Sequence, residues 1–190
     1  LARLPRGTAR GFRFIGRDRE ERYYPFEALE AEAYRRAAFL ATLGLAKGDR
    51  VALVVGEPHE FVLTLLGSIV GGFVPVPIFP RASFKNVESY VETLSHIVGI
   101  SSARVAVCME GNREVVTQLE GRVPCLEKVV TVESFFTGET PAFTPEAITP
   151  DDLCFLQFTS GSTATPKGVM VTHGNLRANA WAVMRDGART

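Results

Sequence analysis

Ten consecutive residues near the end of the chain carry side chains suited to binding a polyphosphate. The segment reads Thr159-Ser160-Gly161-Ser162-Thr163-Ala164-Thr165-Pro166-Lys167-Gly168, and it follows the apolar stretch Leu153–Phe158, which we expect to form a strand. Backbone N–H groups of a glycine-containing loop can form a concave anion site, and hydroxyls add further donors. Lys167 supplies a mobile positive charge for terminal phosphate oxygens, and the segment contains no carboxylate to repel them.

Three other interpretations compete with a phosphate loop. The Walker pattern requires Gly-Lys followed by Ser or Thr, whereas here Pro166 precedes the lysine and Gly168 follows it, which argues against a P-loop kinase or GTPase. Ser160 does not stand in a G-x-S-x-G elbow, which argues against a serine hydrolase. A solvated linker stays open on composition alone, because clusters of Ser, Thr, Gly and Pro commonly form loops.

An alternation of strands and helices leads up to this segment. Apolar residues recur every three or four positions from Phe26 to Leu40, which predicts a helix between Pro25 and Gly44. We then expect strands at 51–55, 73–76, 104–108, 128–132 and 153–158, and helices at 58–70, 87–98 and 112–119. This order predicts an α/β fold with a mostly parallel sheet and helices on its faces. Ligands of such sheets bind beyond the carboxyl ends of the strands.

A charge-free run from Phe61 to Phe79 is long enough to raise the question of a membrane helix. Gly71 and Gly72 would end such a helix, and two prolines beyond them would each remove a backbone donor. We therefore expect a helix followed by a short buried strand, and no membrane span. The run could line a tunnel for an apolar ligand, or it could simply pack in the core.

Composition narrows the functional class. The chain has 190 residues, of which 46% are hydrophobic and 22% charged, values that exclude a disordered tail. Its 21 basic and 21 acidic residues cancel, so we expect no nucleic-acid partner. Three widely spaced cysteines form no C-x-x-C pair, which argues against a zinc site and a disulfide framework and favours reduced core residues. No signal-peptide core opens the sequence, and we expect a cytoplasmic protein.

The remaining polar candidates have structural explanations. Thr172-His173-Gly174-Asn175 is typical of a helix start with Thr172 or Asn175 as its cap, so we favour a structural role for His173 over a substrate contact. His59 and His96 lie in helical patterns and receive no function. Asp151 and Asp152 precede a strand, where adjacent side chains point to opposite faces, so we expect a solvated turn and no metal site.

The stretch from Leu156 to Leu176 resembles the phosphate-binding signature of the adenylate-forming, AMP-binding enzymes, which include acyl-CoA synthetases, luciferases and peptide-synthetase adenylation domains. Two further features, Leu156-Gln157 and the run Val74-Pro-Val-Pro-Ile-Phe-Pro80, most resemble the fatty acyl-AMP ligases within that superfamily. Gly48-Asp49-Arg50-Val51-Ala52-Leu53 also stands where that family has its first buried strand. The resemblance runs from about Phe12 to Trp181, nearly the whole chain.

The resemblance implies an ATP-dependent activation of a fatty acid to an acyl-adenylate, which is then passed to the phosphopantetheine thiol of an acyl carrier protein or polyketide synthase. It implies ATP and Mg2+ as cofactors. It further implies that phosphate is bound by the hydroxyls, the lysine and one glycine backbone, namely Thr159, Ser160, Gly161, Ser162, Thr163 and Lys167. No catalytic residue and no metal ligand is assigned, because the family's other motifs have no counterpart before Thr190.

The family proteins are about three times longer than this chain, so we expect an incomplete enzyme that does not complete adenylation alone. Residues 1–22 are interpreted as an arm with the first hairpin strand, and residues 23–190 as the amino-terminal portion of the AMP-binding domain, without its carboxy-terminal domain. Two alternatives stay open. One is a long-chain acyl-CoA ligase or an amino-acid adenylation domain, and the other is a nucleotide- or lipid-binding module without turnover.

Overall fold

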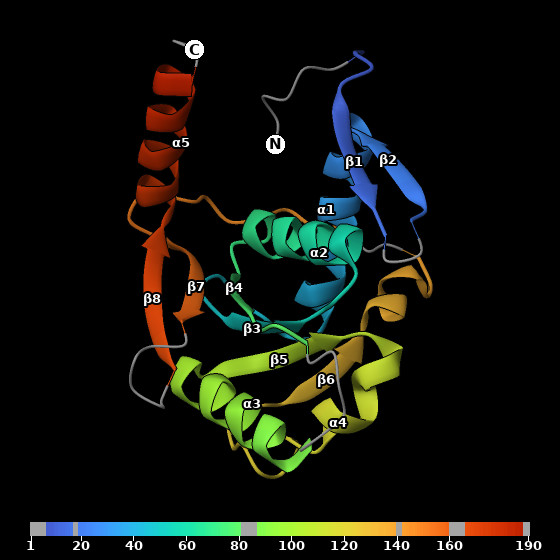
Figure 1. The fold of residues 1–190 in the computed structure, drawn as a ribbon, viewed down its shortest axis with the longest axis vertical. Helices are drawn as coiled ribbons and strands as arrows, with labels where there is room; N and C mark the ends of the chain where they lie inside the picture. Colours follow the sequence, from blue (N-terminus) through green and yellow to red (C-terminus); the bar gives the residue numbers. More distant parts are fainter. Residues whose placement is uncertain (1–6, 17–18, 81–86, 140–141, 160–165, 188–190) are drawn as a thin grey trace.

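The computed structural model describes residues 7–16, 19–80, 87–139, 142–159 and 166–187, and its centre is a four-stranded parallel sheet (Figure 1). The strands lie in the order β4 (Val74–Pro77), β3 (Arg50–Val54), β5 (Ala103–Cys108) and β6 (Lys128–Thr131). Val51 of β3 lies between Pro75 of β4 and Val105 of β5, and Val107 lies beside Val130 of β6. The expected α/β architecture is confirmed.

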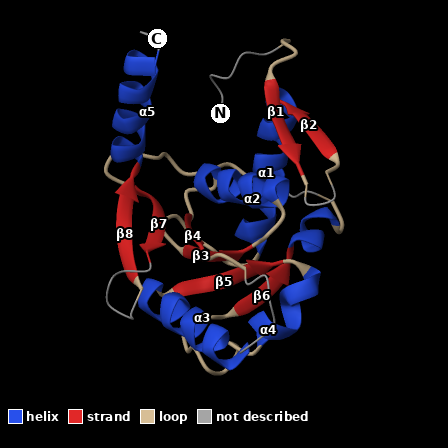
Figure 2. Cartoon of the chain, viewed as in Figure 1, coloured by secondary structure: helices blue, strands red, loops and turns tan. Residues whose placement is uncertain are grey.

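Helices cover both faces of the parallel sheet (Figure 2). Val51 and Leu53 of β3 pack in the core under α1 and α2, whereas Ala52 and Val54 pack in the core under α3 and α4. Alternate residues of a strand point to opposite faces, so a strand covered on both sides is apolar throughout. The helical elements are α1 (Phe26–Thr42), α2 (Pro58–Val70), α3 (Val87–Ser101), α4 (Arg113–Thr117), and the short 3-10 helices Glu110–Asn112 and Val132–Phe136.

The charge-free run Phe61–Phe79 forms most of α2 and all of β4, as expected. α2 begins with Pro58 at its first turn and ends at Gly71, and β4 then carries two prolines. β4 is the edge strand of the parallel sheet, a position where a missing backbone donor is tolerated. Across the described ranges, we find no helix with the length and apolar character needed to cross a bilayer.

Helix α1 follows the predicted apolar spacing but also buries a charge. Leu29, Ala33 and Leu40 are buried as expected, and Arg36 lies among them with 0% of its surface exposed. The Arg36 guanidinium pairs with Glu32 and, at 2.6 Å, with Glu60 of α2. A buried charge is tolerated when it is paired and hydrogen-bonded, so this ion pair joins α1 to α2.

Two antiparallel hairpins stand beside the parallel sheet. β1 (Gly11–Ile15) and β2 (Glu21–Pro25) form the first, in which a polar side chain separates Phe12 from Phe14 along β1. β7 (Leu153–Thr159) and β8 (Lys167–Thr172) form the second, and α5 (His173–Gly187) follows it. We expected Leu153–Phe158 to be the last strand, and this was wrong: β8 continues the chain as its antiparallel partner. The apolar part of β8 is too short to be recognised as a strand without its partner.

Candidate functional site

The β7–β8 hairpin brings the two described ends of the hydroxyl-rich segment together. Thr159 and Lys167 are the last register partners of its ladder, and both are exposed. Ser160, Gly161, Ser162 and Thr163, which the sequence also predicts to bind phosphate, lie outside the described residues. Among the residues that the structure describes, no carboxylate pairs with Lys167, so its ammonium is available to an external anion.

Packing on one face of β7 fixes the strand that carries Thr159. Leu156 and Phe158 pack against the core beneath α3, while Gln157 and Thr159 are exposed. Because side chains alternate along a strand, Gln157 and Thr159 share one face. The sequence analysis assigned Gln157 no role at the site, although this alternation could have placed it beside Thr159.

The far end of the hairpin is fixed by the start of α5. Thr172 N–H donates to Asn175 Oδ1, and Asn175 N–H donates to Thr172 Oγ1, each at 3.1 Å. This reciprocal cap confirms that Thr172 and Asn175 begin a helix. His173 N–H donates to the Asp152 backbone oxygen at 3.0 Å. Burial lowers the pKa of the His173 ring, which is consistent with the structural role expected for it.

Asp152 takes part in this turn as well. Its Oδ2 accepts the Thr149 N–H at 2.6 Å and lies 2.8 Å from Lys47 Nζ. The pKa of Asp152 is lowered to about 2, chiefly by the Lys47 hydrogen bond and then by Thr149. Nowhere in the described part of the chain do three or more His, Cys, Asp or Glu side chains gather as metal ligands. Sequence reasoning missed the pairing with Lys47, which lies far away in the chain.

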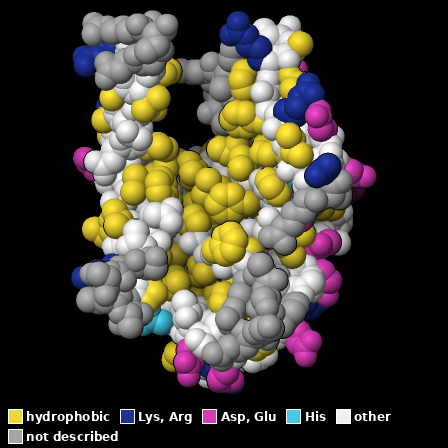
Figure 3. All heavy atoms as spheres, in the orientation of Figure 1, with side chains coloured by type: hydrophobic (Ala, Val, Ile, Leu, Met, Phe, Trp, Pro, Cys, Tyr) yellow, Lys and Arg dark blue, Asp and Glu magenta, His cyan; other side chains and the backbone are white. Residues whose placement is uncertain are grey.

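An apolar groove of about 340 Å³ opens at the carboxyl ends of β3 and β4. Gln157 of β7 is one of its walls, which places the groove beside the strand that ends at Thr159. Among the residues that the structure describes, those that line the groove are all uncharged: Val55, Gly56, Pro58, Phe61, Pro77, Ile78, Phe79, Pro80 and Gln157. Phe79 is 78% exposed. Hydrophobic side chains gather across the middle of this face of the molecule, over α2 and β4 (Figure 3).

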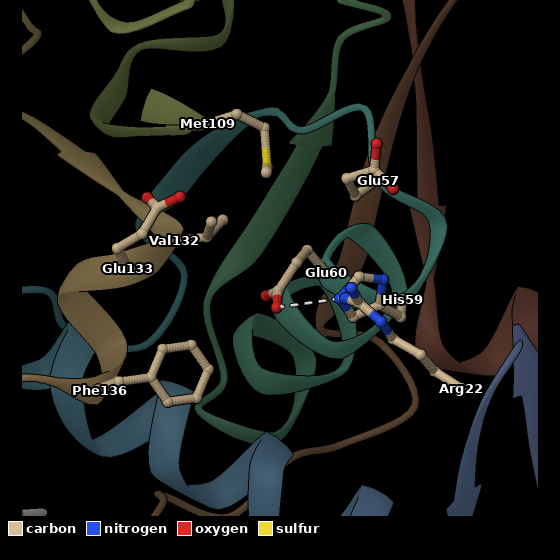
Figure 4. A pocket seen from close by; sticks show the side chains of 8 residues that line it. All are labelled: Arg22, Glu57, His59, Glu60, Met109, Val132, Glu133 and Phe136. Atoms are coloured by element: carbon tan, nitrogen blue, oxygen red, sulfur yellow. Dashed lines mark hydrogen bonds and ion pairs between the residues drawn. The ribbon is translucent and has the colours of Figure 1, made fainter. Parts of the chain in front are cut away.

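A second cavity, of about 390 Å³, lies at the carboxyl ends of β3, β5 and β6 and is charged (Figure 4). The view shows Arg22, His59 and Glu60 grouped on one wall, with Glu133 and Phe136 on the other. Arg22 Nη1 donates to His59 Nε2, and Glu60 Oε1 lies 3.3 Å from the same nitrogen. Burial is the main cause that lowers the pKa of His59. These contacts join the β1–β2 hairpin to α2.

The cysteines do not form a reactive site. Cys108 and Cys154 are buried, Cys125 is half-buried, and all three are free. Burial raises the pKa of the Cys108 thiol to about 12 and also raises that of Cys154, so neither is a thiolate at neutral pH.

Comparison with known proteins places this geometry in a family. The sequence profile of the family described as "AMP-binding enzyme" matches residues 6–190. The chain is 32% identical to the L-proline--[L-prolyl-carrier protein] ligase of Pseudomonas fluorescens, over 97% of this chain and 36% of that protein. It is 31% identical to the benzoate--CoA ligase of Thauera aromatica, over 80% of this chain and 29% of that protein. The chain thus spans about a third of the length of the curated relatives it matches.

Solved structures give the same result. A structure from a study of fatty acyl-adenylate ligases from E. coli and L. pneumophila is 28% identical, with a TM-score of 0.85 over 95% of this chain and 32% of that chain. The L. pneumophila fatty acyl-adenylate ligase in complex with acyl adenylate and pyrophosphate is 30% identical, with a TM-score of 0.74 over 88% of this chain and 28% of that chain.

Proposed function

Because the chain belongs to the family of AMP-binding enzymes, we propose that it supplies the phosphate-binding part of an enzyme that activates a fatty acid with ATP. The product is an acyl-adenylate, and the acyl group is then passed to the phosphopantetheine thiol of an acyl carrier protein. In this proposal residues 23–190 are the amino-terminal portion of the AMP-binding domain, and residues 1–22 are an arm with the first strand of the hairpin.

The observation that carries the proposal is the pairing of Thr159 with Lys167 at the end of the β7–β8 ladder. In the activation step a carboxylate oxygen of the acid bonds to the α-phosphorus of ATP, and the bond from that phosphorus to the pyrophosphate oxygen breaks. Negative charge then grows on the pyrophosphate. An exposed ammonium and hydroxyl donors next to one another can bind those oxygens and stabilise that charge.

The seven residues between this pair include the remaining predicted phosphate donors, Ser160, Gly161, Ser162 and Thr163. Their part in binding stays a prediction. Mg2+ would enter with the nucleotide and bind its phosphate oxygens, as it does in many ATP sites, and would share the charge with Lys167.

The apolar groove beside Gln157 supports a fatty acid as the substrate. The described residues that form its walls carry no charge that could pair with the ammonium group of an amino acid. Cavities of this size are typical of small-molecule sites, and each buried methylene contributes roughly 0.8 kcal/mol. The similarity to a fatty acyl-adenylate ligase structure that holds acyl adenylate and pyrophosphate supports the same substrate class.

The thiol acceptor distinguishes the proposal from its alternatives. Relatives of similar identity include both a carrier-protein ligase and a CoA ligase. In this proposal, either thiol would accept the acyl group after the same activation step. The experiment is ATP–pyrophosphate exchange by the full-length protein with a series of fatty acids, proline and benzoate. CoA and a phosphopantetheinylated carrier protein are then supplied as acceptors.

We expect exchange with fatty acids and acyl transfer to the carrier protein. ATP–pyrophosphate exchange with proline or benzoate in place of fatty acids would contradict the assignment of a fatty acid as the substrate. Transfer to CoA alone would contradict the assignment of a carrier protein as the acceptor. ATP binding without exchange for any acid would favour a binding module without turnover.

A further inference from the structure

The base of the β7–β8 hairpin is built on a single turn, residues 149–152. Thr149 N–H donates to Asp152 Oδ2 at 2.6 Å, which closes the turn. The turn also accepts two backbone N–H groups from the start of α5, from His173 to Asp152 O and from Gly174 to Pro150 O. A β-carbon on Gly174 would lie 3.0 Å from the Pro150 oxygen, so glycine permits this close approach. The turn, the first residue pair of the hairpin and α5 are therefore connected.

Lys47 connects this turn to the parallel sheet. Its Nζ lies 2.8 Å from Asp152 Oδ2 and donates to Ala147 O at 2.7 Å. The backbone around Lys47 is fixed in its turn, because Gly48 N–H donates to Gly72 O and Val74 N–H donates to Asp49 O, both at 2.8 Å. The ammonium of Lys47 is thus attached to the amino ends of β3 and β4.

Few other directional contacts fix the hairpin against the sheet. In the described part of the chain, β7 and β8 are hydrogen-bonded to each other and form no ladder with the four-stranded sheet. Leu156 and Phe158 pack against the core, but hydrophobic packing is non-directional and permits small sliding movements. Charged hydrogen bonds have a preferred geometry, and so the Lys47–Asp152 pair restricts these movements.

From these contacts we propose that Lys47 and Asp152 are positioning residues, which fix the base of the hairpin so that Thr159 and Lys167 at its other end are correctly placed for the phosphates of ATP. This inference rests on the proposed function. Leu153 and Thr159 are six residues apart, about 20 Å along a strand at ~3.4 Å per residue. A tilt of a few degrees at the base therefore moves the phosphate-binding end by about 1 Å, a displacement that can cost up to about 10²-fold in rate.

The Lys47–Asp152 pair is partly exposed, with 25% and 30% of the two side chains accessible. Exposed ion pairs contribute only about 0–1 kcal/mol to stability. Removing the pair should therefore leave the protein folded, and a change in ATP affinity can be attributed to the position of the hairpin.

The test is ATP–pyrophosphate exchange by the full-length protein carrying Lys47→Met, Asp152→Asn, both together, or Lys47→Arg. Lys128→Met is the matched control, because Lys128 also donates to a backbone oxygen, Leu43 O at 3.3 Å, but lies on β6 at the opposite edge of the sheet. Hydrogen exchange of the β7 and β8 amides is measured on the same samples.

We expect Lys47→Met and Asp152→Asn each to raise the KM for ATP about tenfold and to lower kcat as well, within the loss of up to about 10²-fold in rate that a displacement of about 1 Å can cause. The effects of the two substitutions should not add in the double variant, because each single substitution already removes the ion pair that they share. Lys47→Arg should retain the KM for ATP, Lys128→Met should not change it, and amide exchange in β7 and β8 should accelerate only when the pair is broken.

An unchanged KM for ATP in Lys47→Met and Asp152→Asn would overturn the inference, whether or not amide exchange accelerates, because faster exchange alone indicates a merely structural contact. An equal effect of Lys128→Met would overturn it as well. Lys167→Ala in the same assay separates the two proposals. If Lys167→Ala abolishes ATP–pyrophosphate exchange while Lys47→Met leaves the KM for ATP unchanged, only the positioning role fails. ATP–pyrophosphate exchange at the full rate in Lys167→Ala would contradict the proposed function itself.

Discussion

The ring of Phe158 lies directly over the backbone of Gly168, its register partner in the β7–β8 hairpin. A β-carbon on Gly168 would lie 2.9 Å from Phe158 Cζ and 3.3 Å from both neighbouring ring carbons. Real β-carbons do not approach so closely, so either the ring or β8 would have to move. The glycine therefore lets β8 run flat across Phe158, one residue before the strand pair Thr159–Lys167.

We predict that Gly168→Ala displaces β8 and raises the KM for ATP. Overpacking of this kind costs about 1–3 kcal/mol and is relieved when the neighbour becomes smaller. Phe158→Leu added to Gly168→Ala should therefore restore much of the lost affinity. Val169→Ala, at a position that is 50% exposed, is the control and should have no effect. An unaltered KM for ATP in Gly168→Ala would show that the path of β8 does not determine phosphate binding.

A second prediction concerns the rim of the apolar groove. Phe79→Asp places a carboxylate beside the hydrocarbon part of the acid and should raise the KM for a fatty acid. The apolar substitution Phe79→Leu should leave that KM close to the value of the unchanged protein. Because Phe79 is largely exposed, neither change should lower stability. KM values for the acid and for ATP are measured for both variants. If the KM for the acid is the same in both, the groove does not hold the acid.

A third prediction concerns pH. Burial lowers the pKa of His59 in the folded protein, while the unfolded chain has the ordinary value near 6.5. On acidification the unfolded chain takes up this proton first, so the free energy of unfolding should fall as the pH drops below about 6.5. Urea unfolding at several pH values between neutral and mildly acidic measures this loss.

His59→Gln is the control variant, because it removes the titrating ring and should flatten the pH dependence. His173 contributes in the same direction, since burial lowers its pKa as well, and the variant lacking both rings should be flatter still. Stability that rises on acidification, or a pH dependence identical in His59→Gln, would contradict the buried neutral state of His59.

Local patterns predicted most of the fold. The helices α1 and α2 and the strand β4 were recognised because apolar spacing, glycines and prolines act within a few residues. β8 was not recognised, because three apolar residues become a strand only through pairing with β7. Arg36 was also missed, since its burial depends on Glu60, which lies on another helix.

For the candidate site as well, local patterns predict some features, and contacts between distant residues determine the others. Thr159 and Lys167 could be predicted from residue types in one short segment, and their direct pairing across the ladder is a property of the hairpin. The groove beside Gln157 and the contact between Lys47 and Asp152 join residues that are far apart in the chain. Such contacts follow from the folded topology, and no periodicity in a single sequence indicates them.

The most direct test of the phosphate-binding role is ATP–pyrophosphate exchange by the full-length protein with Lys167→Ala, with Lys167→Arg as the charge-retaining comparison. Removing one group that stabilises the developing charge typically costs about 10²–10³ in rate, so Lys167→Ala should lose at least that much while its thermal stability is unchanged. Lys167→Arg should lose less. Exchange by Lys167→Ala at the rate of the unchanged protein would contradict the assignment of this hairpin to the phosphates of ATP.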